Sequence, residues 1–433
     1  MVTNQAAARE VYTGMYKIPA GRRSHLFAII LFGTLVISML ISDTQSEGAE
    51  FTIRPSITVS EEYDDNIFLT NDNRVGDYIT RILPSVNIHY KTPLWEWTLD
   101  DTFSLWYYAK QGRTENFNNG SLTSKVNVIE NFLYLDAGDI YSSVVLNPTK
   151  PSTETNLATN RSDSNNLVLS PYIKYRLTPA SVLSTGYRYT NIWYKDETAI
   201  SRQMHTGFAT GEYKFSPVLS TYVGAEYTAD RPEKIEPDND QTAVFARTVY
   251  KMNERTTFDG SIGYRWVDFS VGHDEGSLIY DASLVYRLSE HGQIELKAAS
   301  LVTSSPLDGI LESRNEQATV KYGEAFSVNW SIFHRKDTYL EKDLVEKAYG
   351  GTLGVEYKPD TRLTFKIGGR VERDEFLPGD DVRKIYAGSG EIDYQLQEKM
   401  TLILSYNYTR ENASNSSFEY ADNVVSVQIR KTF

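Results

Sequence analysis

The amino-acid sequence predicts an all-β protein, a transmembrane antiparallel up-and-down β-barrel of about 18–20 strands. Three observations predict it. Apolar and polar residues alternate with a period of two along much of the chain, a tyrosine block recurs at intervals of about 36 residues, and the chain holds 30 tyrosines. A wall with one apolar and one polar face fits a barrel that has lipid outside and water inside.

The alternation is clearest over residues 257–266, 278–288, 362–372 and 400–409. Successive side chains of a strand point to opposite faces, so each segment presents one apolar and one polar face. A soluble sandwich would show the same pattern, and the length and repetition of the chain favour the membrane barrel. The polar face then lines the lumen, either as a wet, moderately selective pore or as pairs that brace neighbouring strands. Its predicted lumen-lining residues are Asp259, Arg265, Asp281, Arg287, Glu295, Lys297, Arg362, Lys366, Arg370 and Glu372.

The repeat is a short block that begins with tyrosine, as in Tyr175-Arg-Leu-Thr-Pro. A period near 36 residues predicts one hairpin per repeat, with the tyrosine beside a short turn at the membrane surface. A β-propeller also repeats near 40 residues, but would show four strands per repeat and a more apolar interior. The repeated tyrosines are Tyr175, Tyr213, Tyr250, Tyr286, Tyr322, Tyr357 and Tyr394.

The connections alternate in length, with short ones after the repeated tyrosines and longer ones between them, for example over residues 111–119 and 147–162. We count a first strand over 51–65, nine hairpins and a last strand over 418–433, which makes about 20 strands. The turn near Glu130 is weakly marked, so 18 strands stay open. Either number is even, which predicts both termini in the periplasm. The predicted hairpins begin near residues 76, 120, 163, 202, 241, 275, 312, 344 and 382.

Residues 1–49 are predicted to be a signal peptide, and residues 50–433 the barrel. Arg22 and Arg23 precede the apolar run 26–41, and Ala49 follows a polar stretch. The segment before the arginines is long, which suggests that translation begins at Met15. An uncleaved anchor is the alternative, although a membrane-spanning helix usually needs about 20 apolar residues.

The last strand carries apolar residues at alternating positions and ends in an aromatic residue. This pattern resembles the signal by which the barrel assembly machinery selects outer-membrane barrels. Lys431 departs from the usual apolar residue, but a lysine at the interface can extend its amine to water. The predicted assembly signal is Val425, Val427, Ile429 and Phe433.

Composition excludes several chemistries. The chain has no cysteine, so it has no disulfide, thiolate metal site or cysteine nucleophile, and its net charge of −13 argues against a nucleic-acid partner. No hydrolase or phosphate-loop motif occurs, and the six histidines are scattered. We therefore expect no enzyme activity, no catalytic residue, no cofactor and no metal site. The oxygens near Tyr63-Asp-Asp-Asn66 could hold Ca²⁺, but their spacing is not that of an EF-hand.

The start of the barrel resembles a known family. Tyr63-Asp-Asp-Asn66-Ile67, followed by Asp77 and Pro84, is similar to the first hairpin of the beta-barrel porin 2 type of outer-membrane protein. Barrels of this group occur beside exopolysaccharide and PEP-CTERM protein-sorting systems. The specific likeness covers a single hairpin, and it implies a Gram-negative outer-membrane barrel without catalytic residues.

Three functions follow as hypotheses. The first is a conduit for exopolysaccharide export with a periplasmic polysaccharide-export protein, which would show lumen-facing tyrosine and tryptophan in a continuous track. The second is a general diffusion porin, which would fold a long loop into the barrel, and residues 147–162 are the candidate. The third is a structural sleeve around a partner protein. A TonB-type receptor is not expected, because the first strand follows the signal directly. Outer-membrane lipid and lipopolysaccharide are the remaining expected partners.

Overall fold

A computed structural model describes residues 49–147, 150–153, 156, 159–233, 236–340, 342–379 and 381–433. The chain divides into a first unit, Met1–Ala49, and a barrel unit, Glu50–Phe433. The predicted signal peptide lies outside the described residues except for Ala49.

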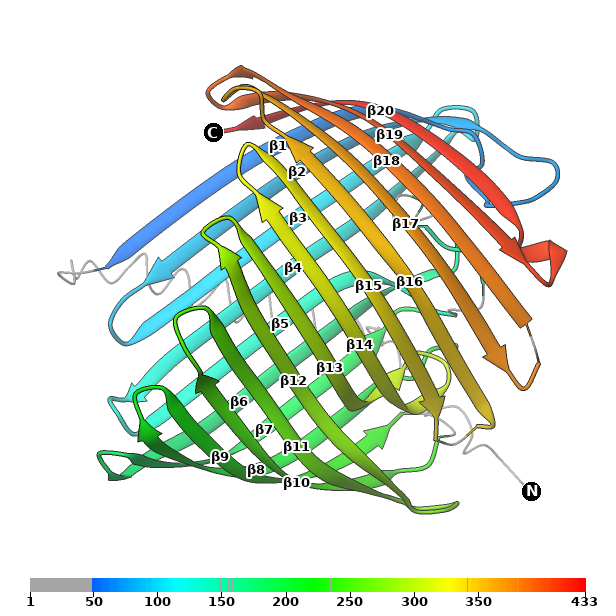
Figure 1. Ribbon diagram of the computed structural model, residues 1–433. Helices are drawn as coiled ribbons and strands as arrows, with labels where there is room; N and C mark the ends of the chain where they lie inside the picture. The colour runs from blue at the N-terminus through cyan, green and yellow to red at the C-terminus, as the bar shows by residue number, and fades with distance from the viewer. Residues whose placement is uncertain are drawn as a thin grey trace, which may run out of the picture. The chain divides into compact units, whose positions relative to one another are not determined.

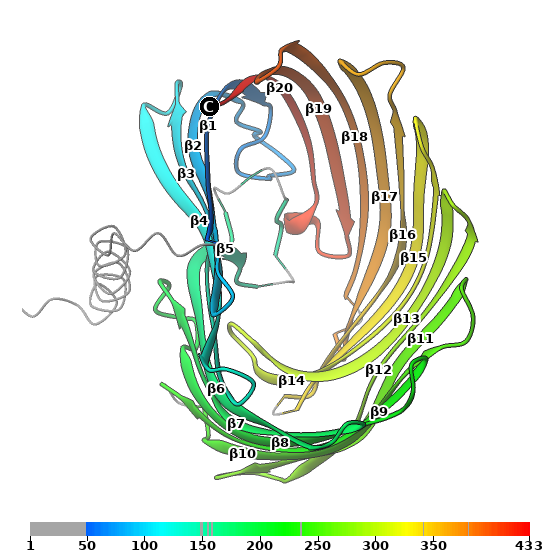
Figure 2. The ribbon, with the colours of Figure 1, turned by 90° about the vertical axis from the view of Figure 1, so that its left-hand side faces the viewer.

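The barrel unit is a closed ring of 20 antiparallel strands (Figures 1 and 2). The first ten are β1 (Glu50–Asp64), β2 (Asp77–Lys91), β3 (Trp95–Tyr108), β4 (Arg113–Ile129), β5 (Leu133–Val145), β6 (Arg161–Thr178), β7 (Ser181–Tyr194), β8 (Arg202–Ser216), β9 (Leu219–Pro232) and β10 (Asn239–Lys251). The others are β11 (Thr256–Phe269), β12 (Glu275–Ser289), β13 (Gly292–Ser305), β14 (Gly309–Gly323), β15 (Phe326–Tyr339), β16 (Leu344–Tyr357), β17 (Leu363–Leu377), β18 (Asp381–Gln397), β19 (Met400–Ala413) and β20 (Tyr420–Thr432).

Each strand pairs with its neighbours in the chain, and β1 pairs with β20 from Ser56↔Thr432 to Asp64↔Val424. The predicted fold class is confirmed, with 20 strands rather than 18. One short 3-10 helix, Ser416–Phe418, precedes β20. Across the described ranges, no helix has the length and apolarity to span a bilayer.

The two ends of the barrel differ in their connections. At the end that we call the turn end, the strands are joined by short turns such as 179–180, 217–218 and 398–399. At the opposite loop end, the connections include 65–76, 146–160 and 195–201. Because the strand number is even, β1 begins and β20 finishes at the turn end.

The predicted loop over 111–119 is wrong, because β4 begins at Arg113 and only residues 109–112 connect it to β3. Asn116 and Asn118 share the outward face of β4, opposite Leu105 and Phe103 of β3. The sequence of this stretch is polar, but backbone pairing with β3 makes it a strand, because ladder hydrogen bonds do not depend on side-chain polarity. The strand therefore begins six residues before the expected end of the loop.

The outer surface carries two girdles of exposed tyrosine. All seven repeated tyrosines are exposed near the turn end. A second girdle, nearer the loop end, comprises Tyr63, Tyr78, Tyr107, Tyr187, Tyr227, Tyr264, Tyr349, Tyr386 and Tyr406.

Exposed apolar side chains, such as Ile82, Leu353 and Val371, lie between the girdles. Along β18 the girdles are represented by Tyr386 and Tyr394, roughly 26 Å apart along the strand. Strand tilt reduces this length to a height close to that of a lipid-spanning belt. The outer wall is therefore suited to a bilayer.

Candidate functional site

The predicted lumen-lining residues fall on the inner face, with one exception. The register places them on the other face from the exposed apolar residues. Asp259 and Arg265 lie on β11, Asp281 and Arg287 on β12, Glu295 and Lys297 on β13, and Lys366, Arg370 and Glu372 on β17. Arg362 lies in the turn before β17 and not within a strand.

These residues are distributed among several local ion pairs. The Lys366 amine lies 2.6 Å from Glu391 and 2.8 Å from Asp393, both on β18. Asp259 accepts hydrogen bonds from Arg247 at 2.8 and 2.6 Å. Only Arg370 and Glu372 join the larger network described next.

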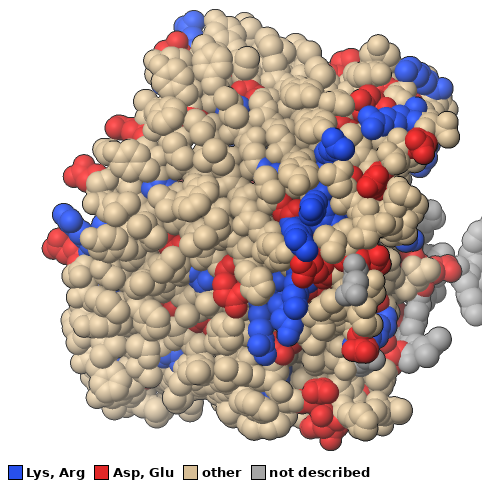
Figure 3. All heavy atoms as spheres, turned by 45° about the vertical axis from the view of Figure 1, so that its right-hand side comes forward, with Lys and Arg blue, Asp and Glu red and all other residues tan. Residues whose placement is uncertain are grey.

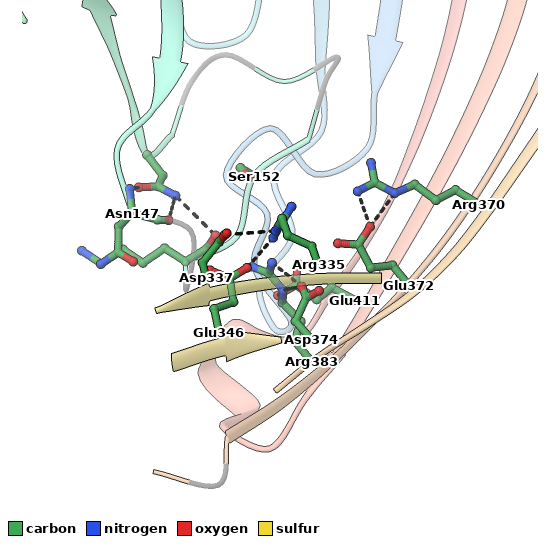
Figure 4. A network of polar contacts seen from close by, with 12 residues as sticks. Asn147, Ser152, Arg335, Asp337, Glu346, Arg370, Glu372, Asp374, Arg383 and Glu411 are labelled. Atoms are coloured by element: carbon green, nitrogen blue, oxygen red, sulfur yellow. Dashed lines mark hydrogen bonds and ion pairs between the residues drawn. The ribbon is translucent and has the colours of Figure 1, made fainter. Parts of the chain in front are cut away.

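The largest inner network crosses β15 to β19, and we call it the lumen cluster (Figure 4). Arg335 lies 2.5 Å from Glu346 and 3.1 Å from Asp337. Arg383 lies 2.5 Å from Asp374 and 3.7 Å from Glu411. The members are Arg335, Asp337, Glu346, Arg370, Glu372, Asp374, Arg383 and Glu411.

The register of the strands creates this cluster. Asp374 lies directly opposite Arg383, and Asp337 opposite Glu346. Arg370 and Glu372 are two residues apart on β17, so they share one face and form an ion pair. Sequence alternation placed Arg370 and Glu372 on this face but did not find the residues of β15, β18 and β19. The sequences of β15, β18 and β19 also alternate, and this alternation could have assigned their residues to the inner face.

Within the connection 146–160, the described residues 146–147, 150–153, 156 and 159–160 lie inside the barrel (Figure 2). The carbonyl oxygen of Ser152 accepts a hydrogen bond from the Tyr420 hydroxyl of β20 at 3.2 Å. The Asn156 amide donates to the carbonyl oxygen of Ile67 at 2.8 Å. The Asn160 side chain joins both ends of the connection by bonding the backbone of Asn147. We call residues 146–160 the inner loop.

The inner loop and the lumen cluster face each other across a cavity of about 620 Å³. Ser152, Thr153 and Arg161 line one side, and Arg335, Glu346, Arg370, Glu372 and Arg383 are among the residues that line the other. Arg161, Arg335, Arg370 and Arg383 line this space together with Glu346 and Glu372. The other three carboxylates of the lumen cluster belong to the same network but do not line the cavity. A charged lining favours water and polar solutes over apolar ones.

A second arginine cluster lies at the loop end of β8 to β10. Arg202 is 2.7 Å from Asp230 and 3.0 Å from Glu236, and its side chain is 1% exposed. Burial raises the pKa of Glu236, and the nearby Arg202 charge partly offsets this effect. The backbone nitrogen of Ile200 also bonds the carbonyl oxygen of Pro306 at 2.8 Å. This cluster packs three connections together.

The inner wall opposite the lumen cluster carries aromatic rings. Tyr134 and Tyr172 stack with ring centroids 5.3 Å apart, and the Lys174 amine lies 5.0 and 5.3 Å from the two centroids. A Cβ atom at Gly224 would lie 2.5 Å from the Phe245 ring, so that ring needs the glycine beside it. We call Tyr134, Tyr172, Phe208, Tyr222 and Phe245 the aromatic strip. Sequence reasoning named such a track but did not locate it.

The Tyr63–Asn66 motif holds the barrel seam. Asp65 accepts hydrogen bonds from the backbone and side chain of Asn423 at 2.8 Å each, and the Asn66 amide donates to the carbonyl oxygen of Ala421 at 2.9 Å. Carboxylate oxygens of Asp64, Asp65 and Asp422 lie within 4.8 Å of one another. The motif therefore joins the first strand to the last.

The predicted assembly signal lies on the same seam. Val425, Val427 and Ile429 are exposed on the outer face of β20, opposite Tyr63, Glu61 and Val59 of β1. Phe433 follows the strand, is also exposed, and its backbone nitrogen bonds Pro55. The geometry is that of a last strand with a lipid-facing apolar edge.

A closed barrel with two aromatic girdles, an apolar belt and a charged, hollow interior defines a transmembrane β-barrel channel of the outer-membrane type. Among solved structures, the FrpB iron transporter from Neisseria meningitidis is similar, with a TM-score of 0.46, 10% identity and coverage of 88% of this chain and 81% of that chain. A ferric enterobactin receptor, PfeA, from Pseudomonas aeruginosa is also similar, with a TM-score of 0.48, 9% identity and coverage of 89% of this chain and 81% of that chain.

The siderophore receptor PirA from Pseudomonas aeruginosa is similar with a TM-score of 0.46 and 10% identity, and the match covers 88% of this chain and 80% of that chain. No family model and no curated protein matches the chain. The assignment as an outer-membrane β-barrel therefore rests on the fold. These comparisons do not support the narrower porin 2 type.

Proposed function

We propose that this protein is a water-filled channel in the outer membrane of a Gram-negative bacterium, and that it passes small hydrophilic solutes by diffusion. The observation that carries the proposal is that described residues of the inner loop, Ser152 and Thr153, face the lumen cluster over a cavity of about 620 Å³. A barrel of this strand number is wide enough to conduct water unless a segment fills it. The inner loop narrows the passage.

The charges around the passage support weak rather than strict selectivity. Arginines and carboxylates alternate along the wall, and several are partly exposed, such as Arg335 and Arg370. Ions within about 8 Å of such a wall feel both signs of charge at physiological salt. The channel needs no catalytic residue and no cofactor.

The proposed orientation of the barrel in the membrane follows from the lengths of the connections at its two ends. Short turns face the periplasm in outer-membrane barrels, and longer loops face outward. The turn end would therefore be periplasmic, with both ends of the barrel unit there. Residue-specific labelling in intact cells would test this: an exposed Val271→Cys at the loop end should react with an impermeant maleimide, and Val218→Cys at the turn end should not.

Single-channel recording tests the channel proposal. We expect steady conductance from the purified barrel in planar bilayers, and an increase of about two-fold when residues 148–158 are replaced by Gly-Ser-Gly, because the narrowest part widens. Shortening the connection 270–274, where Val271 is exposed, is the matched control and should leave conductance unchanged. A wild-type barrel that never conducts would contradict the proposal, as would an unchanged conductance in the inner-loop variant.

A second candidate is passage of a saccharide, including exopolysaccharide export with a periplasmic partner. The aromatic strip favours it, because aromatic faces present rigid apolar area beside polar groups, and sugars have both. Soluble glycans should then block the current, and the double variant Tyr134→Ala with Tyr172→Ala should weaken the block. Currents that glycans do not affect would exclude this candidate and leave diffusion of small solutes.

A further inference from the structure

A row of basic side chains crosses the outer surface at the loop end of β14 to β19. Figure 3 shows lysine and arginine gathered in a band between the uncharged belt and the mixed charges of the rim. The band lies just beyond the girdle on its loop side: Lys347 is two residues from Tyr349, and Lys384 two residues from Tyr386. We call this set the basic row, and its members are Arg314, Lys336, Lys347, Arg373, Lys384 and Arg410.

The register brings like charges together. Lys336 lies directly opposite both Arg314 and Lys347, and Arg373 lies opposite Lys384. Like charges that face each other across strands destabilise a sheet. An anion outside the wall would remove this repulsion.

The carboxylates nearby do not neutralise the row. Glu312 lies 2.6 Å from Arg314, Glu375 lies 2.9 Å from Arg373, and Glu316 is 2.8 Å from His334. These are three carboxylates beside six cations. Within the described parts of the chain, Lys336, Lys347 and Lys384 have neither an ion pair nor a side-chain hydrogen bond. Three amines are therefore available at the membrane surface.

The wall at β10 and β11 is different at the same end. Asp240 faces Asp268 across these two strands, and Arg231 lies 2.8 Å from Asp240. The basic row is thus not a general property of the rim.

The geometry points to a binding site for the phosphate groups of lipopolysaccharide on the basic row. The row lies where the apolar belt meets water, which is the level of lipid phosphates. Acyl chains would cover the belt beside Leu353 and Val371, while the amines and guanidinium groups bind phosphate. This inference uses the proposed outward orientation of the loop end but does not depend on conduction.

Binding of lipid A to the purified full chain in detergent tests the site. The row variant carries Lys336→Gln, Lys347→Gln and Lys384→Gln. The control carries Lys251→Gln, Lys358→Gln and Lys399→Gln at the turn end, which removes the same charge. We expect the row variant to bind bisphosphorylated lipid A roughly 10-fold or more weakly than wild type, and the control to bind normally. Heat-dependent migration in gels verifies that each variant is folded.

Binding measurements with other lipids show which anion the basic row recognises. Dephosphorylated lipid A should bind the wild type as weakly as phosphorylated lipid A binds the row variant. Equal affinity of the row variant and the wild type for phosphorylated lipid A would overturn the inference. So would phosphatidylglycerol binding as tightly as lipid A, because the row would then be a general anionic-lipid surface. Conductance of the row variant should match wild type, so a failed channel proposal would be recognised separately.

Discussion

The two arginine clusters of the barrel contain the same residue types in different surroundings. Arg202 and Asp230 are 1% and 2% exposed and are enclosed by the loop-end connections. In the lumen cluster, Arg335 is 35% and Arg370 40% exposed, although their carboxylate partners are nearly buried. The difference teaches that an inward ion pair in a barrel can stabilise the packing of loops or can line a passage. The exposed fraction of the cation distinguishes the two roles.

The physical reason is solvation. A buried pair loses its water, so removal of one partner leaves an unpaired charge in a poor solvent. A guanidinium in contact with lumen water keeps much of its hydration and contributes little to stability, but its field acts on passing ions. Arg383 is intermediate, at 11% exposed, with Asp374 fully buried. Three substitutions test this graded comparison.

The largest effect is expected for Arg202→Met. It leaves Asp230 and Glu236 without their cation, so we expect the free energy of unfolding to fall by about 3–5 kcal/mol. Urea unfolding in lipid vesicles measures it. Adding Asp230→Asn to the variant should recover part of the loss. Wild-type stability in Arg202→Met would mean that this cluster does not fasten the loops.

A smaller effect is expected for Arg383→Met, which leaves Asp374 and Glu411 unpaired beside the lumen. Both carboxylates are buried, but the Arg383 guanidinium, unlike that of Arg202, keeps some contact with lumen water. We therefore expect a loss of about 2 kcal/mol, between the values for buried and exposed pairs. The same unfolding assay gives the value. A loss as large as that of Arg202→Met would show that the lumen cluster is as dry as the loop cluster, which would break the comparison.

The smallest effect on stability, below about 1 kcal/mol, is expected for Arg370→Gln. Loss of a lumen cation should instead raise the cation-to-anion permeability ratio about two-fold, measured as a reversal potential in a salt gradient. Arg370→Lys should keep the ratio, and Glu372→Gln should shift it in the opposite direction. An unchanged ratio in all three variants would remove Arg370 and Glu372 from the solute pathway.

Much of the barrel wall was predictable from local pattern. The tyrosine repeat located the turns at residues 179–180 and 217–218, and period-two alternation assigned Arg370 and Glu372 to the inner face. Strand ends at the loop end were predicted less well, as at Arg113, because backbone pairing with β3 continues through a polar stretch of sequence. Arg362 was predicted to line the lumen, but it lies in the turn before β17.

The sequence by itself therefore determined the barrel, its girdles and the polarity of its two faces, because a strand turns successive side chains to opposite sides whatever its partners are. Only the tertiary structure decided that the described residues of the inner loop lie in the lumen and that Arg202 is buried. The inner loop depends on the contact of Ser152 with Tyr420, 268 residues later in the chain, and Arg202 on connections from other hairpins. Contacts between such distant segments leave no periodic trace in the sequence, because they form only when the barrel closes and brings the loops together.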